Sequence, residues 1–337
     1  MDIKSTHNFY MSRCIEVAKK GIGKTYPNPS VGCLIVNEGT VISEAFSSEY
    51  GENHAEVNAI NKVKNKNLLK TSTLYVTLEP CSHYGKTPPC CNTISKNKIP
   101  NVVIGTADNS NKVNGKGIEF LRKNNINVTY GVLEKKCKEL HKNFLYFNKN
   151  KRPYIILKWA QSNDKLFSPL KKIKKKPFWI SSKKSRQLSH KWRSEEHAIL
   201  VGYNTVINDN PNLNVRSWKG KNPIRIIIDY DNKLSNKFNV FNDQAKTIKI
   251  TRKNIDPSLH VASEISSFLF RENIQSVIVE GGKKTLEEFI KTNLWDEARI
   301  FTNKKNLSKG IEAPKLKGQI ILEKKIDDDE LKIIKPF

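Results

Sequence analysis

The chain of 337 residues contains few methionines, cysteines and acidic residues, and no long hydrophobic run. No stretch approaches the about 18 apolar residues of a membrane-spanning helix, and the N-terminus carries no apolar signal segment. We therefore expect neither secretion nor a membrane partner. Six unevenly spread cysteines are too few for a disulfide scaffold, which indicates a reducing compartment. Together these absences predict a cytoplasmic protein.

The shortage of acidic residues leaves a formal net charge of +26, from 59 basic and 33 acidic residues. A nucleic-acid partner would favour such a charge, because Lys and Arg neutralise phosphates. The excess is spread along the chain, however, and the one dense block, residues 171–176, contains no aromatic side chain that could stack on a base. We interpret that block as a solvated loop and predict no nucleic-acid partner. A small anionic substrate would also suit a basic surface.

One stretch of the sequence has the residue types of a hydrolytic zinc site. His54 and Glu56 form an H-x-E element, Cys81 follows Pro80, and Cys90 comes after eight further residues. Imidazole and thiolate are zinc ligands, and a catalytic site leaves the fourth position open for a water of lowered pKa. In zinc nucleobase deaminases the H-x-E glutamate carries the proton from water to the leaving ammonia. We therefore predict His54, Cys81 and Cys90 as ligands and Glu56 as the catalytic residue.

Less specific interpretations remain open at this point. An H-x-E element at a helix start is common, and neighbouring cysteines are often buried small hydrophobic residues. Cys91 could replace Cys90, but adjacent helical residues point about 100° apart, so only one should bind the metal. A structural zinc site would need a fourth ligand, for which His83 is the nearest candidate. The general deaminase signature has two residues between its cysteines rather than eight.

Residues 1–147 show alternating strand and helix patterns that predict a three-layer α/β domain. Asn28 lies between two prolines just before a strand; it either holds its amide against a substrate or is an ordinary loop residue. Thr73 to Leu78 is predicted to be a strand that delivers Cys81 at its end, and a helix is predicted to begin at Cys90. Further helices are predicted at 8–20, from His54 and at 117–124, and further strands at 31–36, 41–46, 102–105 and 126–132.

Residues 148–337 show a second α/β pattern, after a polar boundary near 148–152 that ends in a proline. The predicted strand 276–280 opens directly into Gly281-Gly282 and a helix at about 284–292, an arrangement suited to binding a phosphate through backbone N–H groups. No G-x-G-x-x-G sequence is present, so an ordinary Rossmann site is not supported. Other strands are predicted at 154–160, 198–202, 224–229 and 247–251, and a helix at 182–195.

Three runs of residues, 27–32, 54–56 and 78–90, resemble one family. On these runs the chain resembles the bifunctional deaminase/reductase of bacterial riboflavin biosynthesis, in which the eight-residue gap between the cysteines is the usual one. Positions from Trp179 to Gly282 resemble the reductase half of the same family, so the resemblance covers nearly the whole chain. It implies a cytidine-deaminase-like domain at 1–147 and a dihydrofolate-reductase-like α/β domain at 148–337.

The resemblance also implies two consecutive reactions. With Zn²⁺, the first domain would deaminate 2,5-diamino-6-ribosylamino-4(3H)-pyrimidinone 5′-phosphate; with NADPH, the second would reduce the ribosyl side chain to ribityl. By this resemblance the residues against NADPH are Ala160, Trp179, Thr205, Asp209 and Gly282. Those predicted to lie against the substrate are Asn28 and Lys86 in the first domain and Arg193, Leu213, Arg216 and Glu280 in the second. Taken singly, the residues of the second domain could be surface charges, core side chains or turn caps.

The chain departs from the family at several places. Ser47 stands where the family usually has a histidine, and Pro177 stands where it has a serine that touches the substrate. These departures leave open a reductase domain that has lost activity. Two further interpretations also remain: a deaminase of RNA or another base with a non-catalytic second domain, and a non-catalytic zinc protein. The sequence does not decide whether copies of the chain form a homo-oligomer.

Overall fold

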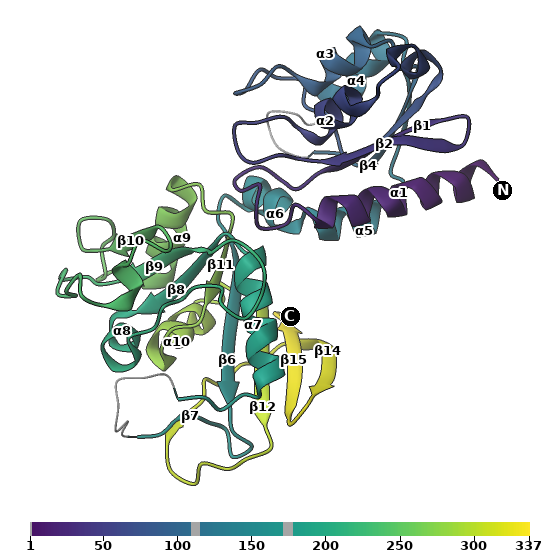
Figure 1. Ribbon diagram of the computed structural model, residues 1–337. Coiled ribbons are helices and arrows are strands. Elements are labelled where there is room, and N and C mark those ends of the chain that lie inside the picture. Colours follow the sequence, from purple (N-terminus) through teal and green to yellow (C-terminus); the bar gives the residue numbers. More distant parts are fainter. Residues whose placement is uncertain (1, 109–114, 171–177) are drawn as a thin grey trace. The chain divides into compact units, whose positions relative to one another are not determined.

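The computed structural model describes residues 2–108, 115–170 and 178–337, so the predictions made for residues 171–176 and Pro177 lie outside the described residues. The chain folds into two compact units, Met1–Asn150 and Lys151–Phe337 (Figure 1). Each unit has its own sheet and its own hydrophobic core.

The first unit is built on a five-stranded sheet in the order β2-β1-β3-β4-β5. Strand β1 is antiparallel to both neighbours, and the remaining pairs are parallel. The strands are β1 (Gly32–Asn37), β2 (Thr40–Phe46), β3 (Thr73–Leu78), β4 (Asn101–Thr106) and β5 (Asn127–Tyr130). Parallel strands β3 and β4 therefore end at the same edge of the sheet, and Cys81 follows β3 at that edge.

Helices cover both faces of this sheet, which confirms the predicted three-layer domain. One face packs against α1 (Ile3–Lys19) and α5 (Glu134–Leu140), and the other against α2 (Ala55–Lys62), α3 (Cys90–Lys96) and α4 (Lys116–Lys123). The unit also contains a short 3₁₀ helix, η1 (Lys66–Thr71), and ends in α6 (Lys142–Asn150). The strand predicted at 73–78 and the helix predicted from Cys90 have these bounds in the structure.

The second unit contains an eight-stranded sheet in the order β10-β9-β8-β11-β6-β12-β15-β14. The first six strands are parallel, and β15 and β14 extend the sheet antiparallel. The strands are β6 (Tyr154–Gln161), β8 (Ala198–Gly202), β9 (Ile224–Ile228), β10 (Thr247–Ile250), β11 (Ser276–Val279), β12 (Glu297–Asn303), β14 (Gln319–Ile326) and β15 (Asp329–Lys335). A separate two-stranded sheet pairs β7 (Leu166–Ser168) with β13 (Ile311–Glu312).

Helices pack on both faces of the large sheet, as in doubly wound α/β folds. They are α7 (Lys183–Glu195), α8 (Tyr203–Asp209), α9 (Val261–Arg271) and α10 (Lys283–Lys291), with a 3₁₀ turn η2 (Asn239–Phe241). Strand β11 lies between β8 and β6 although it follows both in the chain. In such sheets ligands bind beyond the carboxyl ends of the parallel strands, where the chain order reverses.

The structure departs from the sequence-based expectations in three places. The polar segment expected at the boundary is helical as far as Asn150, because α6 is held by the buried side chain of Phe147. The helix expected from His54 begins at Ala55, and His54 is its N-cap. Helices α5, α8 and α9 and the strands after β11 were not predicted. None of the helices in the described part of the chain combines the length and apolarity needed to cross a bilayer.

Candidate functional site

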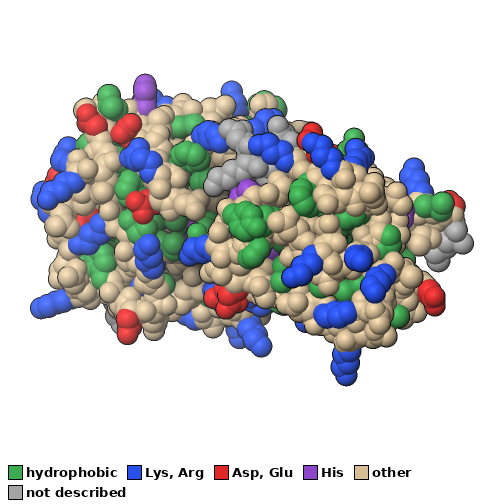
Figure 2. Space-filling view, turned by 90° about the horizontal axis from the view of Figure 1, so that it is seen from above, with side chains coloured by type: hydrophobic (Ala, Val, Ile, Leu, Met, Phe, Trp, Pro, Cys, Tyr) green, Lys and Arg blue, Asp and Glu red, His purple; other side chains and the backbone are tan. Residues whose placement is uncertain are grey.

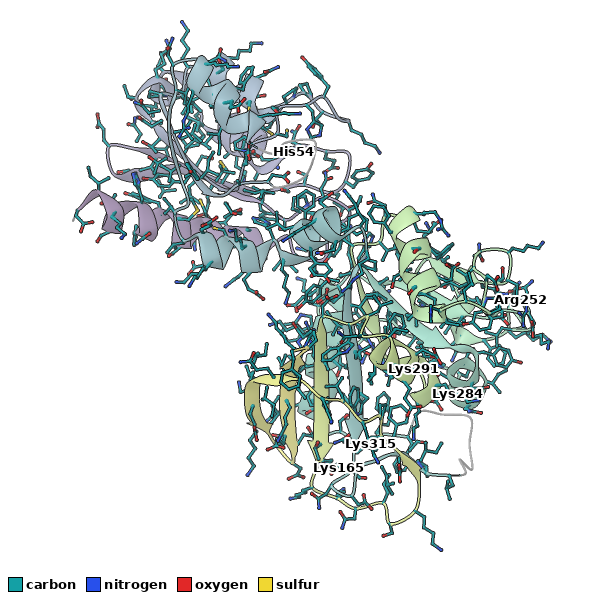
Figure 3. The ribbon with its side chains drawn as sticks, turned by 180° about the vertical axis from the view of Figure 1, so that it is seen from behind. His54, Lys165, Arg252, Lys284, Lys291 and Lys315 are labelled. Atoms are coloured by element: carbon teal, nitrogen blue, oxygen red, sulfur yellow. The ribbon has the colours of Figure 1, made fainter. Side chains whose placement is uncertain are left out.

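The first unit brings the three predicted metal ligands together at the edge where β3 ends. His54, labelled in Figure 3, is the N-cap of α2. Cys81 follows β3, and Cys90 is the first residue of α3. Their ligand atoms all lie within 4.8 Å of one another. The His54 Nδ1 atom lies 3.5 Å from Sγ of Cys81 and 3.3 Å from Sγ of Cys90.

This donor set fits Zn²⁺. Two thiolates and one imidazole are typical zinc ligands, and three protein ligands leave one tetrahedral position open, as catalytic sites require. Within the described ranges no fourth His, Cys, Asp or Glu joins the group. The polypeptide also favours thiolate at Cys81, because hydrogen bonds from Cys90 and His54 lower the pKa of its thiol. The backbone N–H of Cys90 lies 3.3 Å from the same sulfur.

Glu56 lies beside these ligands and is only 3% exposed. Burial raises the pKa of its carboxyl to about 7, against the opposing effect of the His54 charge. Its carboxylate interacts with the Cys90 thiol, which places it at the ligand cluster rather than in the core behind it. The geometry therefore brings a proton-carrying group to the edge of the candidate metal position.

The two alternative ligands take no part in the cluster. The Cys91 thiol points away and donates to the backbone oxygens of Pro80, at 3.3 Å, and Gly117, at 3.6 Å. His83 is exposed and lies outside the group of ligand atoms. Ser47, which stands where the family has a histidine, is buried and accepts a hydrogen bond from the Val31 N–H at 3.1 Å. Its hydroxyl therefore contributes to the connection between β1 and β2.

The two predicted substrate contacts of the first unit have different environments. Asn28 is half-buried, and its backbone closes a turn with Thr25: the Asn28 N–H donates to the Thr25 oxygen at 2.9 Å, and Thr25 Oγ1 donates to the Asn28 oxygen at 2.9 Å. Lys86 is exposed, and its Nζ lies 4.1 Å from the centroid of the Tyr50 ring. Their contacts with a substrate stay predictions.

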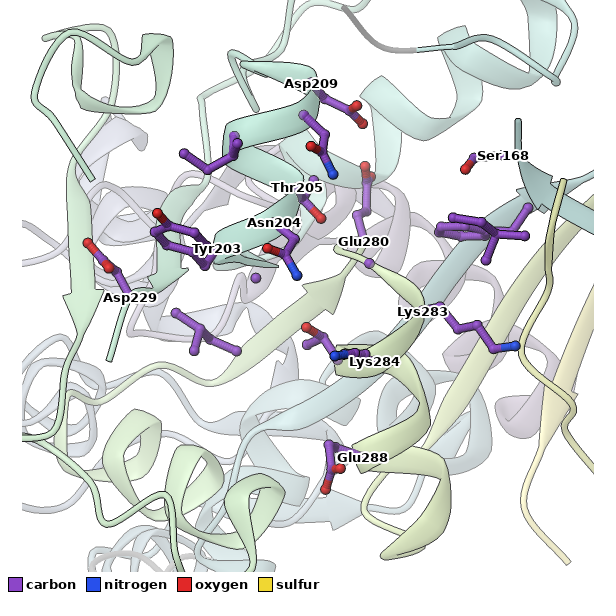
Figure 4. Close-up of a pocket in the computed structure, with 18 of the residues that line it drawn as sticks. Ser168, Tyr203, Asn204, Thr205, Asp209, Asp229, Glu280, Lys283, Lys284 and Glu288 are labelled. Atoms are coloured by element: carbon purple, nitrogen blue, oxygen red, sulfur yellow. The ribbon is translucent and has the colours of Figure 1, made fainter. Parts of the chain in front are cut away.

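A large cavity of about 1130 Å³ opens beyond the carboxyl ends of β8, β9 and β11 in the second unit (Figure 4). Gly202, Asp229 and Glu280 follow or end these strands and lie in its wall. The backbones approach closely here, because a Cβ on Gly281 would lie 2.3 Å from Cα of Val201. The other predicted cofactor residues in this wall are Thr205, Asp209 and Gly282, and Lys283 and Lys284 at the start of α10 join them.

A smaller cavity of about 300 Å³ shares wall residues with the large one, so the two adjoin. Thr205, Asp209 and Glu280 line both. The smaller cavity alone is lined by Arg193, Leu213 and Arg216, which were predicted to meet the substrate. It alone is also lined by Ala160 and Trp179, which were predicted to lie against NADPH, so these two residues are in the smaller cavity and not in the wall of the large one. A cofactor in the large cavity and a substrate in the small one could thus meet at Glu280. The two cavities fit a dinucleotide and a smaller second molecule.

Arg193 and Glu280 are paired with each other rather than free for a ligand. Their side chains are 9% and 11% exposed, and they meet through two hydrogen bonds, Nε–Oε1 at 3.1 Å and Nη2–Oε2 at 2.6 Å. Lys158 Nζ lies 4.0 Å from the same carboxylate. Burial opposes ionisation of Glu280, but the Arg193 and Lys158 charges outweigh it and lower its pKa to about 2.

Arg216 is the more accessible cation at the small cavity. Its guanidinium is 5.9 Å from the Trp179 ring centroid, and Arg186 lies 5.1 Å from the same ring. Trp179 itself is 47% exposed. Burial, followed by repulsion from Arg193, lowers the pKa of Arg216. This concentration of positive charge is suited to an anionic group such as a phosphate monoester.

Sequence reasoning did not single out Lys158, Arg186 or Glu79. Lys158 could have been found, because a lysine within the apolar strand β6 is unusual unless it has a charged partner. Arg186 lies on α7 two turns before Arg193, but nothing in a basic sequence distinguishes it.

On the face shown in Figure 2, Lys and Arg side chains are scattered among other residues rather than gathered into one patch.

Comparisons with known proteins agree with both halves of this description. Residues 4–106 match the cytidine and deoxycytidylate deaminase zinc-binding region, and residues 153–314 match the RibD C-terminal domain. A riboflavin biosynthesis protein RibD of Aquifex aeolicus is 38% identical over 325 residues, covering 92% of this chain and 90% of that protein. A diaminohydroxyphosphoribosylamino-pyrimidine deaminase of Buchnera aphidicola is 48% identical over 136 residues, which cover 40% of this chain and 91% of the relative.

A solved structure extends the similarity to the whole chain. The diaminohydroxyphosphoribosylaminopyrimidine deaminase/5-amino-6-(5-phosphoribosylamino)uracil reductase of Thermotoga maritima superposes with a TM-score of 0.88. It is 35% identical in sequence, and the match covers 100% of both chains.

Proposed function

Because the chain belongs to the RibD family of riboflavin biosynthesis enzymes, with deaminase and reductase activities, we propose how its two units divide that work. The first unit removes the 2-amino group of 2,5-diamino-6-ribosylamino-4(3H)-pyrimidinone 5′-phosphate. The second unit reduces the ribosyl side chain of the deaminated product to ribityl. The observation that carries the proposal is the convergence of His54, Cys81 and Cys90 beside a buried glutamate.

In the deaminase unit, His54, Cys81 and Cys90 would hold the zinc ion. When bound, zinc lowers the pKa of a coordinated water. Glu56 adjoins the ligands and is shielded from bulk solvent, so its carboxylate can take a proton from water and deliver it to the departing amino group. Hydrolysis then balances: water supplies the new carbonyl oxygen, and the amino group leaves as ammonia.

In the reductase unit, the large cavity would hold NADPH, with Thr205, Asp209 and Gly282 in its wall. NADPH supplies a hydride when bound. The small cavity would hold the ribosyl phosphate, with Arg216 at the phosphate and the buried Arg193–Glu280 pair fixing the wall where the cavities adjoin. The guanidinium fork suits the phosphate because it can donate two parallel hydrogen bonds.

The test is an assay of the purified full-length chain with the diaminopyrimidinone substrate, in which ammonia release and NADPH oxidation are followed separately. The proposal predicts ammonia release followed by NADPH oxidation, and Glu56→Gln should abolish the first while leaving the reduction of pre-deaminated substrate intact. Ammonia release without NADPH oxidation would refute the role of the second unit. No ammonia from zinc-loaded protein would refute the role of the first.

A further inference from the structure

Glu79 is a buried carboxylate next to the metal ligands. The proposed reaction gives this carboxylate no role. It is 4% exposed and lies two residues before Cys81, where β3 has ended. A buried carboxylate is costly unless its oxygens are hydrogen-bonded. The partners of Glu79 therefore indicate what it does.

Among the residues that the structure describes, four backbone N–H groups from other parts of the unit donate to Glu79. Oε2 accepts from Asp108, at 3.1 Å, and from Gly115, at 3.2 Å. Oε1 accepts from Gly117, at 2.9 Å, and from Ile118, at 3.3 Å. Three of the donors lie at the beginning of α4, where N–H groups have no partner within the helix and the helix dipole favours a negative charge. Glu79 thus ties the start of α4 to the end of β3.

The start of α4, which Glu79 holds, also contacts the peptide that carries Cys81. Gly117 packs directly against Pro80, because a Cβ on Gly117 would lie 2.2 Å from the Pro80 oxygen. On its other side that oxygen accepts a hydrogen bond from the Cys91 thiol at 3.3 Å. The Cys91 N–H donates to the Cys81 oxygen at 3.2 Å. The ligand-bearing peptide is therefore held between the start of α4 and the start of α3.

We propose that Glu79 is a positioning residue of the metal centre: through the start of α4 and Gly117 it fixes the peptide that presents the Cys81 sulfur. Zinc–thiolate bonds are about 2.3 Å long, so a sulfur displaced by a fraction of that length binds less well. Groups that orient metal ligands without touching the metal typically change metal affinity about 10–100-fold when they are removed. The competing explanation is that Glu79 only caps α4 and stabilises the fold.

Zinc affinity separates these explanations. In Glu79→Gln one carboxylate oxygen becomes an NH₂ group that faces backbone N–H donors, so half of the contacts are lost without a change in size. We expect the zinc dissociation constant of the full-length protein, measured by competition with a chelator, to rise about 10–100-fold. Glu119→Gln is the matched control, because Glu119 is an exposed carboxylate in the first turn of the same helix. It should bind zinc like the wild type.

Cobalt(II) in place of zinc reports the ligand geometry at saturation. Altered visible absorption bands in Glu79→Gln, together with the weaker zinc binding, would support the positioning role. Wild-type zinc affinity in Glu79→Gln would overturn it. So would an equal loss in Glu119→Gln, or a loss of affinity with an unchanged cobalt spectrum, since general destabilisation would explain either result.

If Glu79→Gln does not fold, Gly117→Ala provides the same test from the other side of the peptide. The added methyl group must displace the Pro80 oxygen, so zinc affinity should again fall, and unchanged affinity in the folded variant would overturn the proposal. The inference rests on the proposed zinc site. A wild-type chain that binds no zinc would refute that site. Wild-type zinc affinity in both Glu79→Gln and Gly117→Ala would refute only the role of Glu79.

Discussion

Replacing Glu280 with glutamine should destabilise the second unit strongly. The side chain keeps its size but loses the charge that faces Arg193, whose Nη2 is 2.6 Å away, and Lys158, whose Nζ is 4.0 Å away. Both cations are mostly buried, with side chains 9% and 14% exposed. Without the carboxylate, the two like charges remain close together in a site with little water, which is costly.

The magnitude follows from the pKa of Glu280, which is lowered from 4.5 to about 2 in the folded state. Because each unit corresponds to about 1.4 kcal/mol, ionised Glu280 contributes roughly 3 kcal/mol to the free energy of unfolding. This agrees with the about 3–5 kcal/mol that removal of one partner from a buried ion pair costs. For a unit of this size, 1 kcal/mol shifts the melting temperature by about 2–4 °C, so a decrease of about 6–12 °C is expected.

Tryptophan fluorescence can follow this transition selectively. All five tryptophans, from Trp159 to Trp295, lie in the second unit, so the signal does not report unfolding of the first. Glu287→Gln is the matched control. Glu287 also follows β11, but its side chain is 47% exposed and it pairs with Lys283 at 3.6 Å. An exposed pair of this kind contributes at most about 1 kcal/mol.

The pH dependence provides a second, independent check. Because the folded-state pKa of Glu280 is depressed, its stabilisation is fully present above about pH 4.5 and is lost as the pH falls towards 2. The difference in unfolding free energy between wild type and Glu280→Gln should therefore be constant near neutral pH and narrow below pH 4.5. A melting temperature within about 2 °C of the wild type at pH 7 would refute the reasoning, since even 1 kcal/mol should give that shift.

Three further predictions concern the two sites. Cys90→Ala should abolish zinc binding at micromolar metal, whereas Cys91→Ala should retain it, because the Cys90 sulfur lies next to His54 while the Cys91 thiol donates to the Pro80 oxygen; metal content after dialysis distinguishes the two variants. Removing zinc with a chelator should stop ammonia release but leave NADPH oxidation with pre-deaminated substrate unchanged, and loss of both would contradict separate sites. Arg216→Met should raise the KM for the pre-deaminated substrate about tenfold or more, because one charge-assisted phosphate contact is lost. NADPH affinity, measured by fluorescence titration, should change little. An unchanged KM would contradict the phosphate role of Arg216.

The candidate zinc ligands and the strand-to-helix pattern could be predicted from the sequence because they depend on local chemistry. Imidazole and thiolate ligands can be identified from the residue type alone. Thr73 to Leu78 has the apolar β-branched pattern of a buried strand. The same reasoning predicted α3 from Cys90, since prolines precede it. Strands β14 and β15 were not predicted. Their pairing depends on the sheet edge that β12 forms, and that edge exists only in the folded unit.

Tertiary structure decided which charged groups act together. Arg193 and Glu280 are 87 positions apart, and only the adjacency of α7 to the end of β11 turns two separate charges into a buried pair. Glu79 similarly finds its partners 29 to 39 positions away, and they are backbone N–H groups that carry no sequence signal. The sequence by itself determined the residues that can bind a metal, because ligand chemistry belongs to single side chains. The orientation of those ligands required the fold, because it depends on contacts between segments distant in the chain.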